Sequence, residues 1–161
     1  MNASPIEGLA GAGRLDRVFV DGEWALPAGQ ARSAVIDPST EEPIAEIALG
    51  NAQDVAAAVA AARRAFATWS VSSPQRRAAI LDRIHSLILE RAEVFAQAIS
   101  LEMGCAITVA RGAQVPIAAE HVRVARDLAR SYPFLTHRGD TAIMREAIGV
   151  CGLITPWNWP L

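Results

Sequence analysis

The feature that most limits how this chain can fold is a block of helix signals over residues 51–132, flanked on both sides by strand signals. Asn51 is placed to cap a first helix that ends near Trp69, because its side chain can accept hydrogen bonds from free N–H groups of the first turn. Ser73-Pro74 begins a second helix, with serine as the cap and proline in the first turn. Two further helices are expected, one over residues 92–103 that stops at Gly104 and one that ends at Tyr132, in which Pro116 either fixes the first turn or kinks the helix.

Strand signals precede and follow this helical block. Asp21-Gly22 lies between two apolar-alternating runs and predicts a two-residue hairpin, because both turn positions need positive φ. A second extended pair is expected over residues 34–36 and 44–47, joined by the turn-rich "DPSTEEP". After the helices, "RGD" at residues 138–140 predicts a turn, and residues 150–154 have the composition of a buried strand. The order predicts an α/β fold whose final sheet is only begun.

The composition is that of a globular protein and excludes several kinds of partner. The chain of 161 residues is 52% hydrophobic and 20% charged, which suffices for one domain with a core. Its formal net charge of -2 gives no electrostatic basis for binding nucleic acid or an anionic membrane. Residues 1–16 are rich in Gly and Ala without a period, so we expect them to be loosely ordered and not a signal peptide. No apolar stretch is long enough to span a membrane.

Few residues suggest a metal site or a nucleophile. Cys105 and Cys151 form neither a disulfide framework nor a metal-ligand spacing, which makes a reducing cytoplasm the simplest location. Cys105 follows a helix C-terminus, where the dipole disfavours a thiolate, and Cys151 is expected within the apolar strand. We therefore expect both cysteines to be structural. The three histidines have no metal-ligand spacing, and no segment has the glycine pattern of a phosphate-binding loop.

Two polar residues each allow two interpretations. Glu102 stands in the last turn of a predicted helix, where the dipole disfavours a carboxylate, so it is either simply exposed or lies beside a cation. Asn158 lies within "TPWNWP", between two tryptophans and two prolines. It is either a turn asparagine that caps its own backbone or a stiffly held amide donor of the kind an oxyanion site requires.

The segment "REAIGVCGLITPWNWPL" closely resembles the aldehyde dehydrogenase superfamily, in which an Arg-Glu strand leads through Gly-Val-x-Gly into Pro-Trp-Asn-Phe-Pro. The stretches "FVDGEWALP", "VIDPSTEEPIAEIALGNAQDVAAAVAAARRAFATWS", "RRAAILDRIHSLILER" and "LEMG" follow the family's order and spacing. The resemblance implies oxidation of a small-molecule aldehyde to a carboxylic acid with NAD or NADP. In that family a cysteine attacks the carbonyl to give a thiohemiacetal, hydride passes to the nicotinamide, and a glutamate assists hydrolysis of the thioester.

The resemblance also implies roles for individual residues. Asn158 matches the catalytic asparagine whose amide stabilises the oxyanion. The residues that match the cofactor-lining loop are Ile154, Thr155, Pro156 and Trp157. Val35, Ile36 and Glu102 align loosely with a monovalent-cation site of some members. The sequence departs from the family pattern at Trp159 for phenylalanine, Ala147 for proline and Cys105-Ala106 for Lys-Pro, which leaves the subfamily and the aldehyde open.

By the same resemblance the chain divides into three parts. Residues 1–135 are expected to form the N-terminal part of the cofactor-binding domain, residues 136–149 the strands of an oligomerisation arm, and residues 150–161 the first strand and loop of a Rossmann-like cofactor site. The family's nucleophile, glutamate base and nicotinamide loop follow the motif at which this sequence ends, so we expect an N-terminal piece of a homodimeric or homotetrameric enzyme that is inactive alone. The alternative is a non-catalytic chain that acts as an oligomerisation or interaction module.

Overall fold

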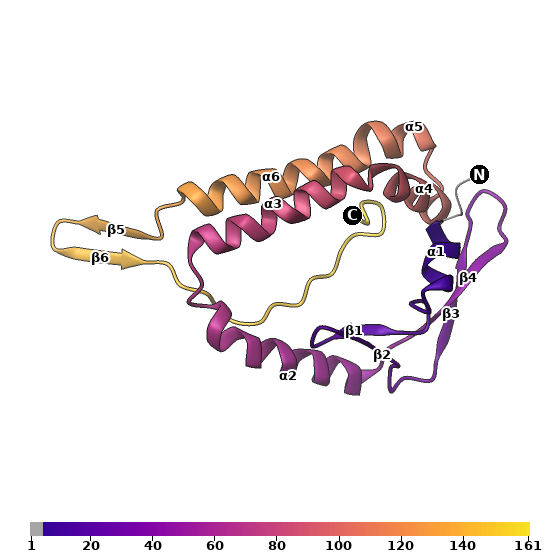
Figure 1. The fold of residues 1–161 in the computed structure, drawn as a ribbon, viewed down its shortest axis with the longest axis horizontal. Coiled ribbons are helices and arrows are strands. Elements are labelled where there is room, and N and C mark those ends of the chain that lie inside the picture. The colour runs from indigo at the N-terminus through magenta and orange to yellow at the C-terminus, as the bar shows by residue number, and fades with distance from the viewer. Residues whose placement is uncertain (1–4) are drawn as a thin grey trace.

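A computed structural model describes residues 5–161, and its helices dominate the fold (Figure 1). The helices are α1 (Pro5–Gly11), α2 (Ala52–Trp69), α3 (Pro74–Glu90), α4 (Ala92–Met103), α5 (Ile107–Val109) and α6 (Val115–Ser131), with a π-helical turn η1 (Ala110–Gln114) between the last two. The strands are β1 (Val18–Val20), β2 (Glu23–Ala25), β3 (Arg32–Ile36), β4 (Pro43–Ala48), β5 (Leu135–Arg138) and β6 (Thr141–Met144). The predicted order of strands, helices and strands is therefore present.

The strands form three separate antiparallel hairpins, β1–β2, β3–β4 and β5–β6. The turn between β1 and β2 has φ of 55° at Asp21 and 85° at Gly22, as the hairpin prediction requires. The β3–β4 pair has a register shift between Val35 and Ile36. The β5–β6 hairpin turns at Gly139, whose φ is 56°, and projects from the end of the helix pair α3–α6 (Figure 1).

The helix boundaries follow the predicted caps closely. Asn51 accepts hydrogen bonds from the backbone of Gln53 and Asp54, and Asp54 in turn accepts from the Asn51 backbone, which completes a capping box. Ser73 caps α3 and Pro74 occupies its first turn. Helix α4 ends at Gly104, which has the left-handed φ of 75° that glycine adopts without strain.

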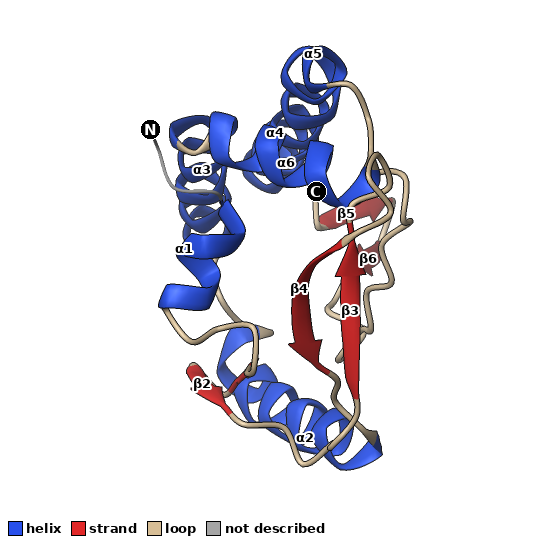
Figure 2. Ribbon diagram, turned by 90° about the vertical axis from the view of Figure 1, so that its right-hand side faces the viewer, coloured by secondary structure: helices blue, strands red, loops and turns tan. Residues whose placement is uncertain are grey.

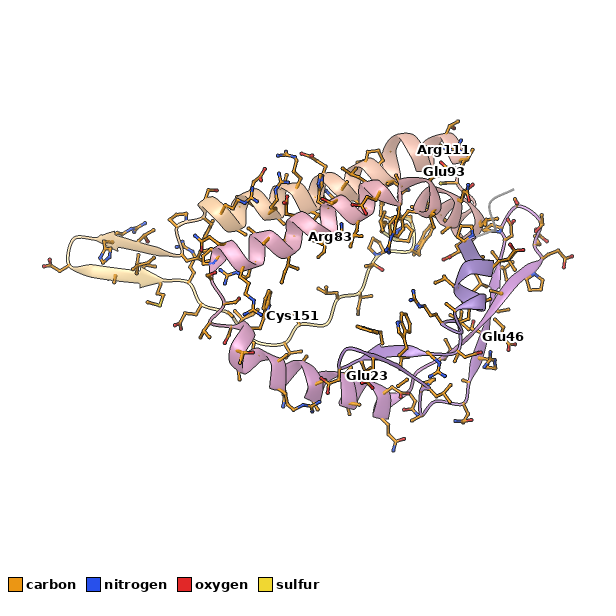
Figure 3. All side chains as sticks on the ribbon, viewed as in Figure 1. Glu23, Glu46, Arg83, Glu93, Arg111 and Cys151 are labelled. Atoms are coloured by element: carbon orange, nitrogen blue, oxygen red, sulfur yellow. The ribbon has the colours of Figure 1, made fainter. Side chains whose placement is uncertain are left out.

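The core lies where α4, η1 and α6 meet, and α3 packs along α6 (Figure 1). Its buried residues are Ile88, Ala96, Ile99, Ala110, Val115 and Ala119. Arg126 on α6 joins the two long helices through an ion pair of 2.8 Å with Asp82 on α3. Another ion pair, of 2.6 Å, joins Arg111 of η1 to Glu93 of α4 (Figure 3). The guanidinium of Arg111 lowers the pKa of Glu93 to about 2.

Two sequence expectations are wrong. Residues 5–11 of the segment expected to be loosely ordered form helix α1, because Ile6 is buried and α1 packs against α4; residues 1–4 lie outside the described part. Residues 150–154 are not a buried strand but exposed coil. No other strand among residues 5–161 pairs with this segment, and a β-strand requires a neighbour for its backbone hydrogen bonds.

Candidate functional site

The candidate site is the segment 154–161, which follows an extended coil that begins at the end of β6. The coil runs past α2, and its end lies beside the α3–α6 helix layer (Figures 1 and 2). An open hollow of about 450 Å³ runs along the coil, between residues 148–152 and the side chains of Val59, Arg63 and Phe66 on α2. The motif thus lies on the side of the long helices that faces the hairpins and α2.

Asn158 occupies a tight turn. The backbone N–H of Trp159 donates to the carbonyl of Pro156 at 3.3 Å, which places Asn158 at the third position of a four-residue turn. The Asn158 side-chain amide has no hydrogen-bond partner among residues 5–161, so it does not cap its own backbone there. Its backbone carbonyl, in contrast, accepts a hydrogen bond of 3.1 Å from Nε2 of Gln114. The turn therefore holds the backbone of Asn158 and leaves both N–H donors of its side chain free.

The four predicted cofactor-lining residues all lie exposed on this segment. Ile154 is 98% exposed and Trp157 is 85% exposed, so each presents nearly its whole apolar side chain to solvent. Apolar and aromatic surface with a few free polar groups is the usual lining of a small-molecule or cofactor site. The structure brings these residues together with Asn158 simply because they are neighbours in the chain.

Gln114 is the residue of this region that sequence reasoning did not single out. It is only 6% exposed, and its Nε2 atom lies 3.9 Å from the sulfur of Met103 as well as 3.1 Å from the Asn158 carbonyl. Its burial with Ala110 and Val115 is visible only in the structure, where a buried amide needs a hydrogen-bond partner. The π-helical turn hid it, since this turn changes the residue spacing that defines a buried helix face.

Neither cysteine is arranged as a nucleophile. Cys105 packs against the core, and its carbonyl accepts a hydrogen bond of 2.9 Å from Ser100. Cys151 lies exposed on the coil (Figure 3), so the expectation that it is buried in a strand is wrong. In the part of the chain that the structure describes, neither sulfur is hydrogen-bonded to a histidine or a carboxylate, the groups that would activate a thiol.

The neighbourhood of Glu102 has no positive partner among residues 5–161. Glu102 is exposed, and desolvation of its carboxylate raises its pKa, because no cationic side chain of the described residues lies beside it to lower that pKa. A Cβ atom on Gly104 would lie 3.0 Å from Cβ of Pro38, so the loop after β3 packs against the end of α4. The described residues hold no group of three metal-ligating His, Cys, Asp or Glu side chains. The monovalent-cation site remains a prediction.

A sequence profile described as "Aldehyde dehydrogenase family" matches residues 24–161. The chain belongs to the aldehyde dehydrogenase family. This confirms the resemblance and the α/β fold class that it implied. This chain is 40% identical, over 144 residues and 89% of its length, to a 3-succinoylsemialdehyde-pyridine dehydrogenase of a Pseudomonas species. It spans only 30% of the length of that relative.

Solved aldehyde dehydrogenases share the arrangement of the elements. The aldehyde dehydrogenase C mutant of Pseudomonas syringae, in complex with NAD+ and octanal, is 59% identical with a TM-score of 0.90, over 92% of this chain and 30% of that one. The indole-3-acetaldehyde dehydrogenase mutant of P. syringae, also with NAD+, is 28% identical with a TM-score of 0.82, over 99% of this chain and 34% of that one. Among residues 5–161 no helix combines the length and hydropathy needed to cross a bilayer.

Proposed function

We propose that the whole protein containing this chain oxidises an aldehyde to a carboxylic acid with NAD or NADP. The observation that carries the proposal is the likeness to the P. syringae enzyme solved with NAD+ and octanal, at 59% identity and a TM-score of 0.90. The likeness favours NAD as the cofactor and a straight-chain aliphatic aldehyde as the first substrate to test. The two unpaired cysteines favour the cytoplasm as the compartment.

Asn158 is the proposed catalytic residue of this chain. When a thiolate attacks an aldehyde, negative charge develops on the carbonyl oxygen, and a preorganised N–H donor stabilises that charge in the transition state. The Asn158 amide fits this role because its donors are unpartnered while its backbone is fastened to Gln114. The attacking thiol and the base come from other parts of the whole protein, since Cys105 and Cys151 have no activating partner in residues 5–161.

Ile154, Thr155, Pro156 and Trp157 are the residues proposed to line the cofactor. Their exposure fits this role, because the side chains of Ile154 and Trp157 leave apolar surface available to a bound ring system. NAD or NADP, when bound, supplies the hydride acceptor of the oxidation. The contribution of these four residues is to bind and orient the cofactor next to Asn158, which follows them directly in the chain.

The projecting hairpin β5–β6 supports the proposal that the whole protein self-associates, as a homodimer or a homotetramer. The rival function is a non-catalytic module that pairs through this arm. The free amide of Asn158 favours the enzyme, because an interaction module has no need of an unpartnered donor next to exposed tryptophans.

The direct test is an assay of the whole protein, expressed from its gene, with octanal and either NAD+ or NADP+. We expect octanal-dependent formation of the reduced cofactor together with one octanoic acid per hydride, and faster turnover with NAD+. A protein that elutes as an oligomer and turns over neither octanal nor an aromatic or semialdehyde substrate would instead be the interaction module.

A further inference from the structure

We propose that Gln114 is a positioning residue that holds the Asn158 turn in place through its backbone carbonyl. The inference rests on the proposed function, because the turn matters to catalysis only if the Asn158 amide is the oxyanion donor. Gln114 does not touch substrate or cofactor in this proposal. It acts through Asn158, which stands 44 residues further along the chain.

The hydrogen bond from Gln114 attaches the segment that contains Asn158 to the helices. Across the described residues, no other hydrogen bond joins residues 152–161 to residues 5–151; within that segment Trp159 pairs with Pro156. The Gln114 side chain is almost fully buried, so a lost partner would leave a buried amide unsatisfied.

The π-helical turn explains why a glutamine reaches the motif from a buried helix face. Five residues of an α-helix advance about 140° beyond a full turn, so Ala110 and Val115 would lie on different faces. In η1 the N–H of Val115 donates to the carbonyl of Ala110, which stacks these two residues, and both are buried. Pro116 favours this arrangement, because proline has no N–H to donate and its ring crowds the preceding turn of an α-helix.

The position of η1 is itself held from both sides. Ala110 and Val115 belong to the core cluster, and Arg111 forms a two-pronged ion pair with Glu93 of α4, at 2.6 and 2.9 Å. Gln114 therefore extends from a fixed backbone toward an otherwise loosely attached coil. Its hydrogen bond restrains the Asn158 turn against the rigid helix core. A preorganised oxyanion site requires such restraint.

The test uses the whole protein with Gln114→Met, which keeps the length of the side chain and removes its donor. Hydrogen exchange of the peptide spanning residues 154–161 should become faster, while exchange in α3 and α6 stays unchanged. The kcat for aldehyde oxidation should fall about threefold to tenfold, the range that one neutral hydrogen bond supplies. KM for the aldehyde should change less than kcat, because the oxyanion donor acts in the transition state.

Two controls make the role of Gln114 specific. Gln30→Met removes an amide that likewise donates to a backbone carbonyl, that of Ala28 at 3.3 Å, away from η1, and it should change neither exchange at residues 154–161 nor kcat. In an Asn158→Ala background, Gln114→Met should add almost no further loss of kcat, because both changes act on one donor. If Gln114→Met does not fold, Gln114→Leu serves in its place, since it also carries no donor and buries no charge.

The outcomes separate this inference from the proposed function. Unchanged exchange at residues 154–161 in Gln114→Met, or a loss of kcat that persists in full without the Asn158 amide, overturns the positioning role while the proposed function stands. An Asn158→Ala protein with wild-type kcat overturns the oxyanion role itself, and this inference with it.

Discussion

At the scale of single residues, the candidate site depends on Asn158, whose backbone is held by hydrogen bonds and whose side-chain amide is free. The tight turn from Pro156 to Trp159 and the bond from Gln114 hold the peptide of Asn158, while no residue between 5 and 161 pairs with its side-chain donors. Such a donor costs no reorganisation when charge develops on a substrate oxygen. Asn158 is therefore the residue at which the proposed function is most open to test.

We expect Asn158→Ala in the whole protein to lower kcat by roughly 10²–10³, equivalent to about 2.7–4 kcal/mol, as for other oxyanion donors. The dissociation constant of the cofactor should change little, because Ile154 to Trp157 are the proposed cofactor contacts. Steady-state kinetics and cofactor titration measure both quantities, with circular dichroism as the control for folding. A kcat within a few-fold of wild type, or collapse of cofactor binding with intact chemistry, would show that Asn158 is an ordinary loop asparagine.

At the scale of elements, the N-terminus of α2 is the junction between the helical block and the N-terminal hairpins. The Asp54 carboxylate accepts backbone hydrogen bonds from Ala28 at 2.8 Å, from Gly29 at 3.1 Å and from Asn51 at 2.8 Å. These donors, with Ala28 the strongest, lower the pKa of Asp54. One carboxylate thus caps the helix and anchors the chain that connects β2 to β3.

The pH dependence of stability should reveal this junction. Because the pKa of Asp54 is lower in the folded protein than in the unfolded one, its contribution is fully present above the unfolded value of about 3.9. It is lost as the pH falls further, through the folded pKa. Asp54→Asn should therefore lower the urea midpoint at neutral pH and flatten its decline below about pH 4. Parallel curves for the two proteins would mean that Asp54 does not stabilise the fold.

At the scale of the whole molecule, the chain has far more surface than a folded monomer of its mass. Its accessible area is 11374 Å², about one and a half times the roughly 7,800 Å² expected from the usual scaling. Among residues 5–161 no large side chain is fully buried, and Ile148, Leu153 and Ile154 are each at least 90% exposed. Apolar exposure of this extent marks surfaces that bind other protein. The chain also spans only 30% of the length of its relatives.

The 161-residue chain by itself should therefore bind hydrophobic dyes, associate with itself and unfold without a sharp transition. It should also fail to reduce NAD or NADP with any aldehyde, because neither of its cysteines has an activating partner in the described residues. Dye fluorescence, light scattering and a cofactor-reduction assay test these points together. A monodisperse monomer with a cooperative two-state melt would contradict the first expectation, and aldehyde-dependent turnover free of longer protein would contradict the second.

The sequence by itself determined the features whose cause is local. The cap at Asn51, the start of α3 at Ser73-Pro74, the end of α4 at Gly104 and the turn at Asp21-Gly22 depend on hydrogen bonds and dihedral angles within a few residues. The family also followed from the sequence, because the motif around Asn158 and its order along the chain are read directly from the residues.

Only the tertiary structure decided the features that depend on distant partners. Helix α1 forms where Ile6 is buried and α1 packs against α4, and residues 150–154 remain coil because no strand of the described chain lies beside them. The contact of Gln114 with Asn158 joins residues 44 positions apart, through a π-helical turn that no hydrophobic period indicates. Such contacts depend on how packed elements bring separated backbone groups together, and local sequence patterns carry no record of that geometry.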